Sequence, residues 1–218
     1  MKFFDYYKEA SETIMERDPA IKNRREVLLY PSFWAVYKYR KAHRLYQEGK
    51  YYRARKISQR AARKTGIEIH PGAEIGKGFF IDHGHGVVIG ETTVIGDNVT
   101  LYQGVTLGGT GKEKGKRHPT LKDGVMVSVG AKVLGNITIG ENSKIGAGSV
   151  VLIDVPPCST VVGIPGRIVR SASVEVPPRR DLDQIHLPDP VKNDIAQLQA
   201  GYAELSAKLD ELLQKERC

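Results

Sequence analysis

The sequence predicts a mainly β protein: a hexapeptide-repeat solenoid with an α-helical domain before it and a coiled-coil helix after it. Aliphatic side chains return at every sixth position, usually with glycine next, in two runs: Ile89, Ile95, Leu101, Leu107 and Val127, Val133, Ile139, Ile145, Val151. A period of six fits neither an amphipathic helix nor an alternating strand. It fits a three-sided β-solenoid in which each face takes one hexapeptide.

Residues 1–66 are expected to form an N-terminal α-helical domain. Aromatic residues are concentrated in this part, and four helices are expected from the residues that typically begin and end helices. The first contains Phe3, Phe4, Tyr7 and Ile14, the second has Asp18 as N-cap and Pro19 as first residue, the third begins at Pro31, and the fourth runs from about residue 50 to residue 64, before Gly66.

The net charge of +8 is concentrated in this helical domain. Residues 1–66 hold 17 Lys and Arg against 7 Asp and Glu, which gives +10 there and −2 for the rest of the chain. We interpret the excess as a solvated helical face and expect neither a nucleic-acid partner nor a membrane partner, because no nucleic-acid motif and no stretch of ~18 apolar residues occurs. Two distant cysteines and a charged N-terminus predict a cytoplasmic protein without disulfides.

Residues 67–170 are expected to form the solenoid, whose period breaks twice. The step from Ile81 to Ile89 is eight residues, which indicates a two-residue bulge around residues 83–87. The step from Leu107 to Val127 is twenty, counted as one coil of eighteen plus two. Residues 108–123, rich in glycine and charge, are expected to form a loop outside the prism, where solenoids tolerate insertions.

The C-terminal part is divided into a linker and a helix. Residues 171–190 contain four prolines and are expected to be a Pro-rich linker. Residues 191–218 are expected to form a heptad helix, because apolar residues follow spacings of four and three: Val191, Ile195, Leu198, Tyr202, Leu205, Leu209 and Leu212. The alternative is a helix that packs on its own solenoid, which tends to give a wider apolar stripe.

Histidines stand at both breaks in the period. His83 and His85 lie in the bulge, and His118 lies in the loop directly after Arg117. A carboxylate beside one imidazole nitrogen fixes the tautomer and leaves the other nitrogen to act as a base, and both Asp82 and Glu68 are candidates beside His83. A zinc site at His83 and His85 is the alternative. We expect no metal, because a catalytic zinc needs three protein ligands.

Seven motifs occur together over roughly residues 10–170. They are Arg17-Asp18-Pro19-Ala20, Ile69-His70-Pro71, Ile81-Asp82-His83, Val88-Ile89-Gly90-Glu91-Thr92, the run from Gln103 to Gly111, Arg117-His118-Pro119, and Gly163-Ile164-Pro165-Gly166-Arg167. In this order they resemble the short form of the serine O-acetyltransferase family, within the hexapeptide-repeat acyltransferases. The hexads alone would indicate only that broader superfamily.

The resemblance implies a fold, an activity and partners. The fold would be a left-handed parallel β-helix, and the activity acetyl transfer from acetyl-CoA to L-serine, giving O-acetyl-L-serine for cysteine biosynthesis. No permanently bound cofactor is implied, because acetyl-CoA is a co-substrate. The assembly would be a homotrimer with active sites between subunits, and L-cysteine would be a feedback inhibitor. The family's tail that binds cysteine synthase ends in Ile, whereas this chain ends Glu216-Arg217-Cys218, which leaves that complex in doubt.

The resemblance also implies roles for individual residues. The catalytic group would be His83, with Glu68 where the family often has Asp, and His118. Serine would be held by Asp18, Asp82, Arg117 and His118. The CoA groove would be lined by Gly109, Thr110, Val129, Gly130, Lys144 and Ala147.

Two other functions fit a trimeric solenoid. One is acetyl transfer to a sugar or another hydroxylated acceptor, which Arg117 argues against, because a fork-shaped cation suits a carboxylate and sugars have none. The other is a structural or regulatory trimer whose solenoid only positions the coiled coil.

Overall fold

A computed structural model describes residues 3–109, 111, 114–171 and 190–215. The chain divides into two compact units, Met1–Leu187 and Pro188–Cys218. The first unit contains three α-helices, a short 3-10 helix and all of the strands, and the second contains one long helix. None of the helices in these described ranges is both long enough and apolar enough to cross a membrane.

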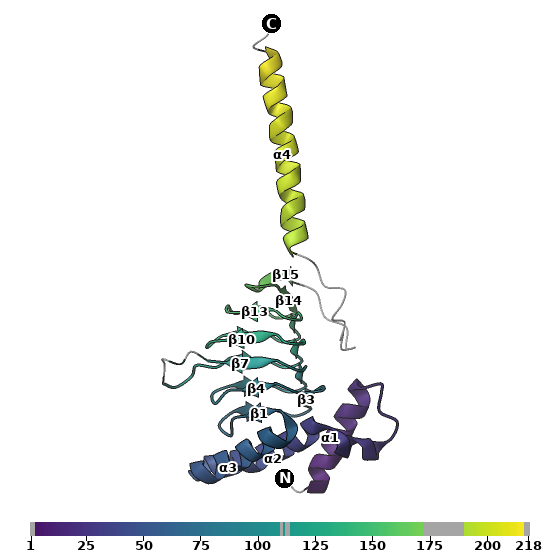
Figure 1. Ribbon diagram of the computed structural model, residues 1–218, viewed down its shortest axis with the longest axis vertical. Helices are drawn as coiled ribbons and strands as arrows, with labels where there is room; N and C mark the ends of the chain where they lie inside the picture. Colours follow the sequence, from purple (N-terminus) through teal and green to yellow (C-terminus); the bar gives the residue numbers. More distant parts are fainter. Residues whose placement is uncertain (1–2, 110, 112–113, 172–189, 216–218) are drawn as a thin grey trace. The chain divides into compact units, whose positions relative to one another are not determined.

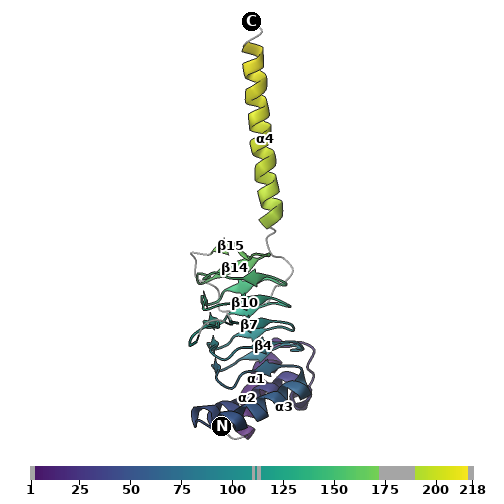
Figure 2. The same ribbon diagram turned by 60° about the vertical axis from the view of Figure 1, so that its left-hand side comes forward.

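The first unit begins with helices that lie at the first-coil end of the solenoid, as both views show (Figures 1 and 2). They are α1 (Phe3–Arg17), η1 (Arg24–Leu29), α2 (Pro31–Gln47) and α3 (Tyr51–Thr65). Pro31 begins α2 as expected, and α3 ends at Gly66, which has the left-handed φ of 71°. Glycine adopts this conformation without the steric cost of a Cβ, so the end of α3 was readable from the sequence.

The helix expected at Pro19 is absent, and this prediction was wrong. Asp18 Oδ1 accepts a hydrogen bond from the amide of Ala20 at 2.8 Å, and the chain forms a turn there. The short helix η1 begins later, with Asn23 as its N-cap. An Asp-Pro step serves a turn as well as a helix start, and here the aspartate closes the turn.

The solenoid consists of short strands stacked in three parallel sheets (Figure 1). Sheet A contains β1 (Glu68–Ile69), β4 (Val88–Ile89), β7 (Thr106–Gly108), β10 (Lys132–Leu134) and β13 (Val150–Val151). Sheet B contains β2 (Glu74–Ile75), β5 (Val94–Ile95), β8 (Thr120–Leu121) and β11 (Thr138–Ile139). Sheet C contains β3 (Phe80–Ile81), β6 (Thr100–Leu101), β9 (Met126–Val127), β12 (Lys144–Ile145), β14 (Ser159–Val162) and β15 (Arg167–Ser171), of which only β15 is antiparallel.

The hexad residues form the core of the prism. In sheet A, Ile89 pairs in register with Leu107, and Val133 pairs with Val151. These four side chains are at most 1% exposed. Each coil therefore places its aliphatic residue directly on the one before it, which is the reason for the period of six.

The two breaks have different sizes. Ile69 pairs with Ile89, twenty positions on, so the first coil carries two extra residues, as expected. Leu107 pairs with Val133, 26 positions on, so the third coil carries eight extra residues rather than two.

The loop boundaries 108–123 therefore need correction. Thr120 and Leu121 form β8, which pairs with β5 and β11, and Leu121 is fully buried. Leu121 stands six residues before Val127 and continues the hexad. Charged residues flank this single aliphatic residue, and the hexad pattern was therefore not recognised there. Because β8 belongs to the prism, the segment outside it lies between β7 and β8.

The second unit contains α4 (Pro190–Lys215). Five of the heptad side chains are described, and Val191, Ile195, Leu198, Tyr202 and Leu205 are each at least 50% exposed. The side chains of Leu209 and Leu212, residues 172–189 of the expected linker and residues 216–218 lie outside the described residues. Pairing of α4 with other copies thus stays a prediction.

Candidate active site

His83 lies at the edge where sheet C turns into sheet A, which we call the C–A edge. It stands two residues after the end of β3 and has a φ of 56°, a left-handed conformation that is uncommon for residues other than glycine. The two extra residues of the first coil are accommodated here, and His83 is exposed. The break in the period therefore turns this imidazole outward, as bulges beside active sites often do.

Helix α1 brings Asp18 to the same edge. Arg17, its last residue, is buried and donates from Nη1 to Val99 O at 3.3 Å and to Thr100 Oγ1 at 3.0 Å, which anchors the helix end on sheet C. Asp18 follows directly, and its Oδ2 accepts a short hydrogen bond from the hydroxyl of Tyr30. Nothing in the spacing of the helical domain selects Tyr30 as a candidate site residue.

Asp18 lies close enough to Asp82 to influence the ionisation of Asp82. The pKa of Asp82 is raised, first by partial burial and further by the charge of Asp18, while His83 acts in the opposite direction. The pKa of Tyr30 is raised by burial and by both carboxylates. Two facing carboxylates repel each other and are relieved by a cation, so this arrangement suits an ammonium group.

Glu68 and His85 have other contacts. Glu68 Oε1 accepts from Gln59 Nε2 of α3 at 3.2 Å, and no hydrogen bond joins Glu68 to His83 in the described part of the chain. The ring of His85 lies against Gly66 at the end of α3, since a methyl group there would be 3.0 Å from its Cδ2.

The C–A edge continues past His83 as a backbone ladder. Gly104 donates to His85 O at 2.9 Å, Gly130 to Gln103 O and Gly148 to Val129 O, both at 2.8 Å. A Cβ on Gly130 or Gly148 would meet nothing within 4 Å, so this edge has an open surface. The candidate groove residues Val129, Gly130 and Ala147 lie along it, and Lys144 lies on β12 of sheet C.

Arg117 and His118 lie at a different edge, where sheet A turns into sheet B, which we call the A–B edge. The His118 ring fits against two glycines: a methyl group on Gly90 would lie 1.9 Å from its Cδ2, and one on Gly109 would lie 3.0 Å from its Nε2. Gly109 therefore belongs to this edge, and Thr110 lies outside the described residues.

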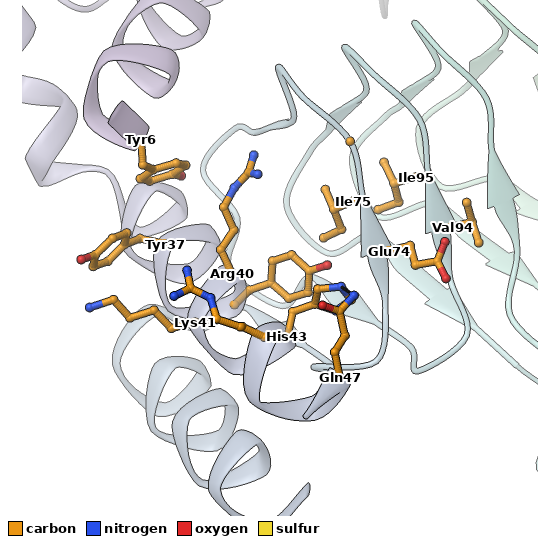
Figure 3. A pocket seen from close by; sticks show the side chains of 13 residues that line it. Tyr6, Tyr37, Arg40, Lys41, His43, Gln47, Glu74, Ile75, Val94 and Ile95 are labelled. Carbon is orange, nitrogen blue, oxygen red and sulfur yellow. Dashed lines mark hydrogen bonds between the residues drawn. The ribbon is translucent and has the colours of Figure 1, made fainter. Parts of the chain in front are cut away.

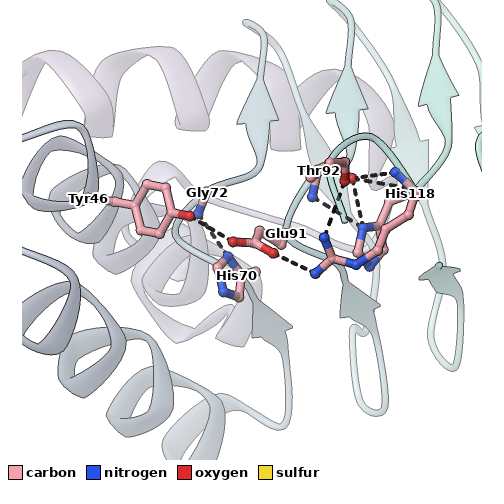
Figure 4. A network of polar contacts seen from close by, with 8 residues as sticks. Tyr46, His70, Gly72, Glu91, Thr92 and His118 are labelled. Carbon is pink, nitrogen blue, oxygen red and sulfur yellow. Dashed lines mark hydrogen bonds and ion pairs between the residues drawn. The ribbon is translucent and has the colours of Figure 1, made fainter. Parts of the chain in front are cut away.

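A polar network runs along the A–B edge (Figure 4). Glu91 accepts from Arg117 Nη2 at 2.5 Å and from the hydroxyl of Tyr46 at 2.7 Å. These two bonds hold the pKa of Glu91 below its usual range, and the bond to Glu91 is the main reason that the pKa of Tyr46 rises to about 12. The charged Glu91 carboxylate, itself held by Tyr46 of helix α2, thus fixes the Arg117 guanidinium.

His70 lies beside this network and is held neutral. Its Nδ1 accepts from the amide of Gly72 at 3.0 Å, and its ring meets Tyr46 edge-on. Burial, with the positive charge of Arg55, lowers the pKa of His70 to about 4.

The predicted site residues therefore form two groups in one chain. Asp18, Asp82 and His83 share the C–A edge, and Arg117 and His118 share the A–B edge. Sequence reasoning missed Tyr30 and Tyr46, because nothing in the spacing of a helical domain indicates which tyrosine reaches a solenoid edge.

A cavity of about 550 Å³ lies between α2 and strands β2 and β5 (Figure 3). Its lining includes Arg40, His43 and Glu74 but none of the predicted site residues. Arg40 pairs with Glu9 at 3.0 Å, and His43 Nδ1 lies 2.8 Å from Pro71 O. The first contact joins α1 to α2, and the second joins α2 to the first coil of the solenoid.

The hexapeptide repeat and the whole chain match known proteins. The family model "Bacterial transferase hexapeptide (six repeats)" matches residues 118–152. A serine acetyltransferase of Bacillus subtilis is 57% identical over 216 residues, covering 99% of this chain and 98% of that protein.

Solved structures match the fold. A Neisseria gonorrhoeae serine acetyltransferase in complex with serine superposes with a TM-score of 0.73 at 45% identity, covering 77% of this chain and 69% of that one. A serine acetyltransferase in complex with cysteine gives a TM-score of 0.74 at 43% identity, covering 76% and 69%. The left-handed parallel β-helix expected from the sequence is confirmed.

The neutral state of His70 predicts how stability depends on pH. Its folded pKa of about 4 lies below the unfolded value of 6.5, so the unfolded chain binds the extra proton first. The stabilising contribution is complete above pH 6.5 and is lost as the pH falls toward 4. His70→Gln keeps an acceptor for Gly72 without a titrating ring, and its melting temperature should fall less steeply than that of the wild type over this range. Parallel curves would contradict this account.

Proposed function

The chain belongs to the serine acetyltransferase family, and from this premise we propose that His83 moves the protons of the reaction while residues of both edges hold the substrates. The chain transfers an acetyl group to serine, and the sugar and purely structural alternatives fall away because a relative of nearly full length is a serine acetyltransferase. The proposal for the residues rests on one observation: Asp18, Asp82 and His83 gather at a single break of the repeat.

His83 is the general base in this proposal. Its imidazole takes the proton of the serine hydroxyl while that oxygen attacks the thioester carbon of acetyl-CoA. The imidazolium then gives the proton to the departing thiolate, so that O-acetyl-L-serine and CoA leave and the neutral base returns. Positioned acid–base catalysis of this kind contributes about 10²–10⁴-fold.

Carboxylates assist at the same edge. We assign Asp18 and Asp82 to the serine ammonium, because a cation would offset both the burial of Asp82 and the repulsion from Asp18, which together raise the pKa of Asp82. Glu68 is proposed as the partner of the second imidazole nitrogen, which requires its side chain to leave Gln59. Tyr30 keeps Asp18 in place through its hydroxyl.

Acetyl-CoA is proposed as the donor, bound along the C–A edge. Val129, Gly130 and Ala147 present an open backbone surface above His83, and Lys144 adds a positive charge for phosphate groups. Gly109 and Thr110 are assigned to the same ligand from the loop after β7. No resident cofactor is needed, because every proton in the scheme is moved by a side chain.

Arg117 and His118 are proposed to hold the serine carboxylate, and a neighbouring copy supplies them. Within one chain they occupy a different edge from His83. A cyclic trimer places the A–B edge of one copy beside the C–A edge of the next, so each site is complete only between copies.

Mixed trimers test the shared site. Chains carrying His83→Ala or Arg117→Ala, each with its own affinity tag, are co-expressed and purified through both tags. Each single variant should lose at least about a hundredfold in kcat/KM. A mixed trimer regains one intact site of three, so activity should return to about a third of the wild type.

A matched pair gives the control for the mixed trimers. His83→Ala and Asp82→Asn lie on the same edge, and trimers that mix these two chains should recover no activity. Recovery in this control, or none in the His83 and Arg117 mixture, contradicts the assignment of the two edges to different copies.

L-Cysteine is proposed to bind in place of serine. It carries the same ammonium and carboxylate, and a similar serine acetyltransferase has been solved in complex with cysteine. Inhibition should be competitive toward serine, and Asp18→Asn should weaken cysteine and serine binding together. Inhibition that is uncompetitive toward serine would exclude a common site.

The exposed seam of α4 is proposed to pair with two other copies as a parallel coiled coil. Replacing Leu198 and Leu205 by Ser should lower the temperature at which the trimer dissociates by roughly 5 °C, with activity per intact trimer retained. Replacing Gln197 and Gln199 by Ser, off the seam, should leave that temperature unchanged. Equal temperatures for the two double variants, measured by sedimentation and light scattering, would contradict the pairing.

A further inference from the structure

Thr92 contacts both residues of the Arg117-His118 pair from one coil earlier on the A–B edge. Its Oγ1 accepts from the amide of Arg117 at 3.0 Å and from the amide of His118 at 3.1 Å. The same oxygen lies 2.9 Å from His118 Nδ1. One hydroxyl group therefore meets the backbone and the ring of the residue that follows Arg117 (Figure 4).

These contacts determine where the hydrogens lie. The two amides are donors and occupy both lone pairs of Thr92 Oγ1, so the hydroxyl hydrogen is left to point at His118 Nδ1. The amide of Thr92 also donates to Nδ1, at 3.2 Å. Because Nδ1 faces two donors, it carries no proton, and the neutral ring has its hydrogen on Nε2.

The charges around His118 favour the same state. Burial and the positive charge of Arg117 lower the pKa of His118, Lys116 acts in the same direction, and Glu91 acts against them. His70, in the first coil, is close enough for the charge of His118 to lower the pKa of His70. A protonated His118 would turn an N–H toward the two Thr92 donors, with three cationic or cation-capable neighbours close by.

We propose that Thr92 is a positioning residue that keeps His118 neutral with its hydrogen on Nε2, so that His118 donates a hydrogen bond to an oxygen of serine and cannot be a second base. This inference rests on the proposed function, which places His118 against serine. The tautomer decides whether His118 is a hydrogen-bond donor or a base. An imidazole whose Nδ1 accepts hydrogen bonds and whose Nε2 is protonated has no free lone pair that could take up a proton.

The chain offers a matched control in the next residue. Thr93 is fully buried, and its hydroxyl has no hydrogen-bond partner among the residues that the structure describes. Thr92→Val and Thr93→Val remove the same group from neighbouring positions, but only the first removes hydrogen bonds to the substrate-binding pair. Thr92→Ser keeps the hydroxyl and loses only a methyl group.

Steady-state kinetics of the full chain give the first readout. Thr92→Val should raise the serine KM by about tenfold, the effect of losing one well-placed hydrogen bond, and should leave the acetyl-CoA KM within about threefold. Thr92→Ser should recover most of this loss, and Thr93→Val should behave as the wild type. Equal effects of Thr92→Val and Thr93→Val on the serine KM would overturn the proposal. So would a Thr92→Ser variant whose serine KM is as high as that of Thr92→Val.

The tautomer gives a second readout that needs no activity. In protein labelled with ¹⁵N-histidine, the His118 signals, assigned by their loss in His118→Asn, should show an unprotonated Nδ1 and a protonated Nε2 at pH 7. Thr92→Val should lose this preference. A wild-type ring with a proton on Nδ1 overturns the proposal even if Thr92→Val does not fold. If His83→Ala stays active while the tautomer is as expected, the proposed base fails and the inference on Thr92 stands.

Discussion

The parallel register between coils is the constraint on which the rest of the molecule depends. Ile89 must lie on Leu107, and Val133 on Val151, for the prism to exclude water, so residues one coil apart are fixed above each other. Any extra residues must leave the prism at an edge. The two insertions therefore do not disturb the core, and they place His83 at one edge and Arg117 with His118 at another.

Stacking at an edge also creates the electrostatic differences between the two groups. At the C–A edge two carboxylates come together, and the pKa of Asp82 rises. At the A–B edge Arg117 stands beside His118, and the histidine pKa falls. One edge thus attracts a cation and the other presents fixed donors for an anion. An amino acid carries both charges, which suits the proposed site shared by the two edges.

The sequence predicted the solenoid because its period of six belongs to few other folds. Histidines at both breaks indicated where candidate residues lie, and the resemblance to a family implied the individual roles, which stay predictions. Prediction from the sequence failed where the signal was a single residue or a long-range contact. Leu121 was hidden by the charges around it, although it is fully buried. The Asp18-Pro19 step indicated a helix, but Asp18 closes a turn onto Ala20 and also accepts from the hydroxyl of Tyr30, twelve residues on. Such contacts depend on how helices pack on the prism, and no local pattern contains that information.

The helical domain completes both edges of the solenoid. Through Arg17 it fixes Asp18 beside Asp82, and through Tyr46 it fixes Glu91, which holds Arg117. The two tethers come from different helices, α1 and α2, so a shift of the helices on the first coil would disturb both groups together. The prism alone supplies His83 at one edge and Thr92 with His118 at the other, but it leaves the proposed ammonium site with one carboxylate and Glu91 without its tyrosine. The helices therefore contribute to both halves of the proposed site, and their attachment to the first coil matters to it as much as the order of the coils.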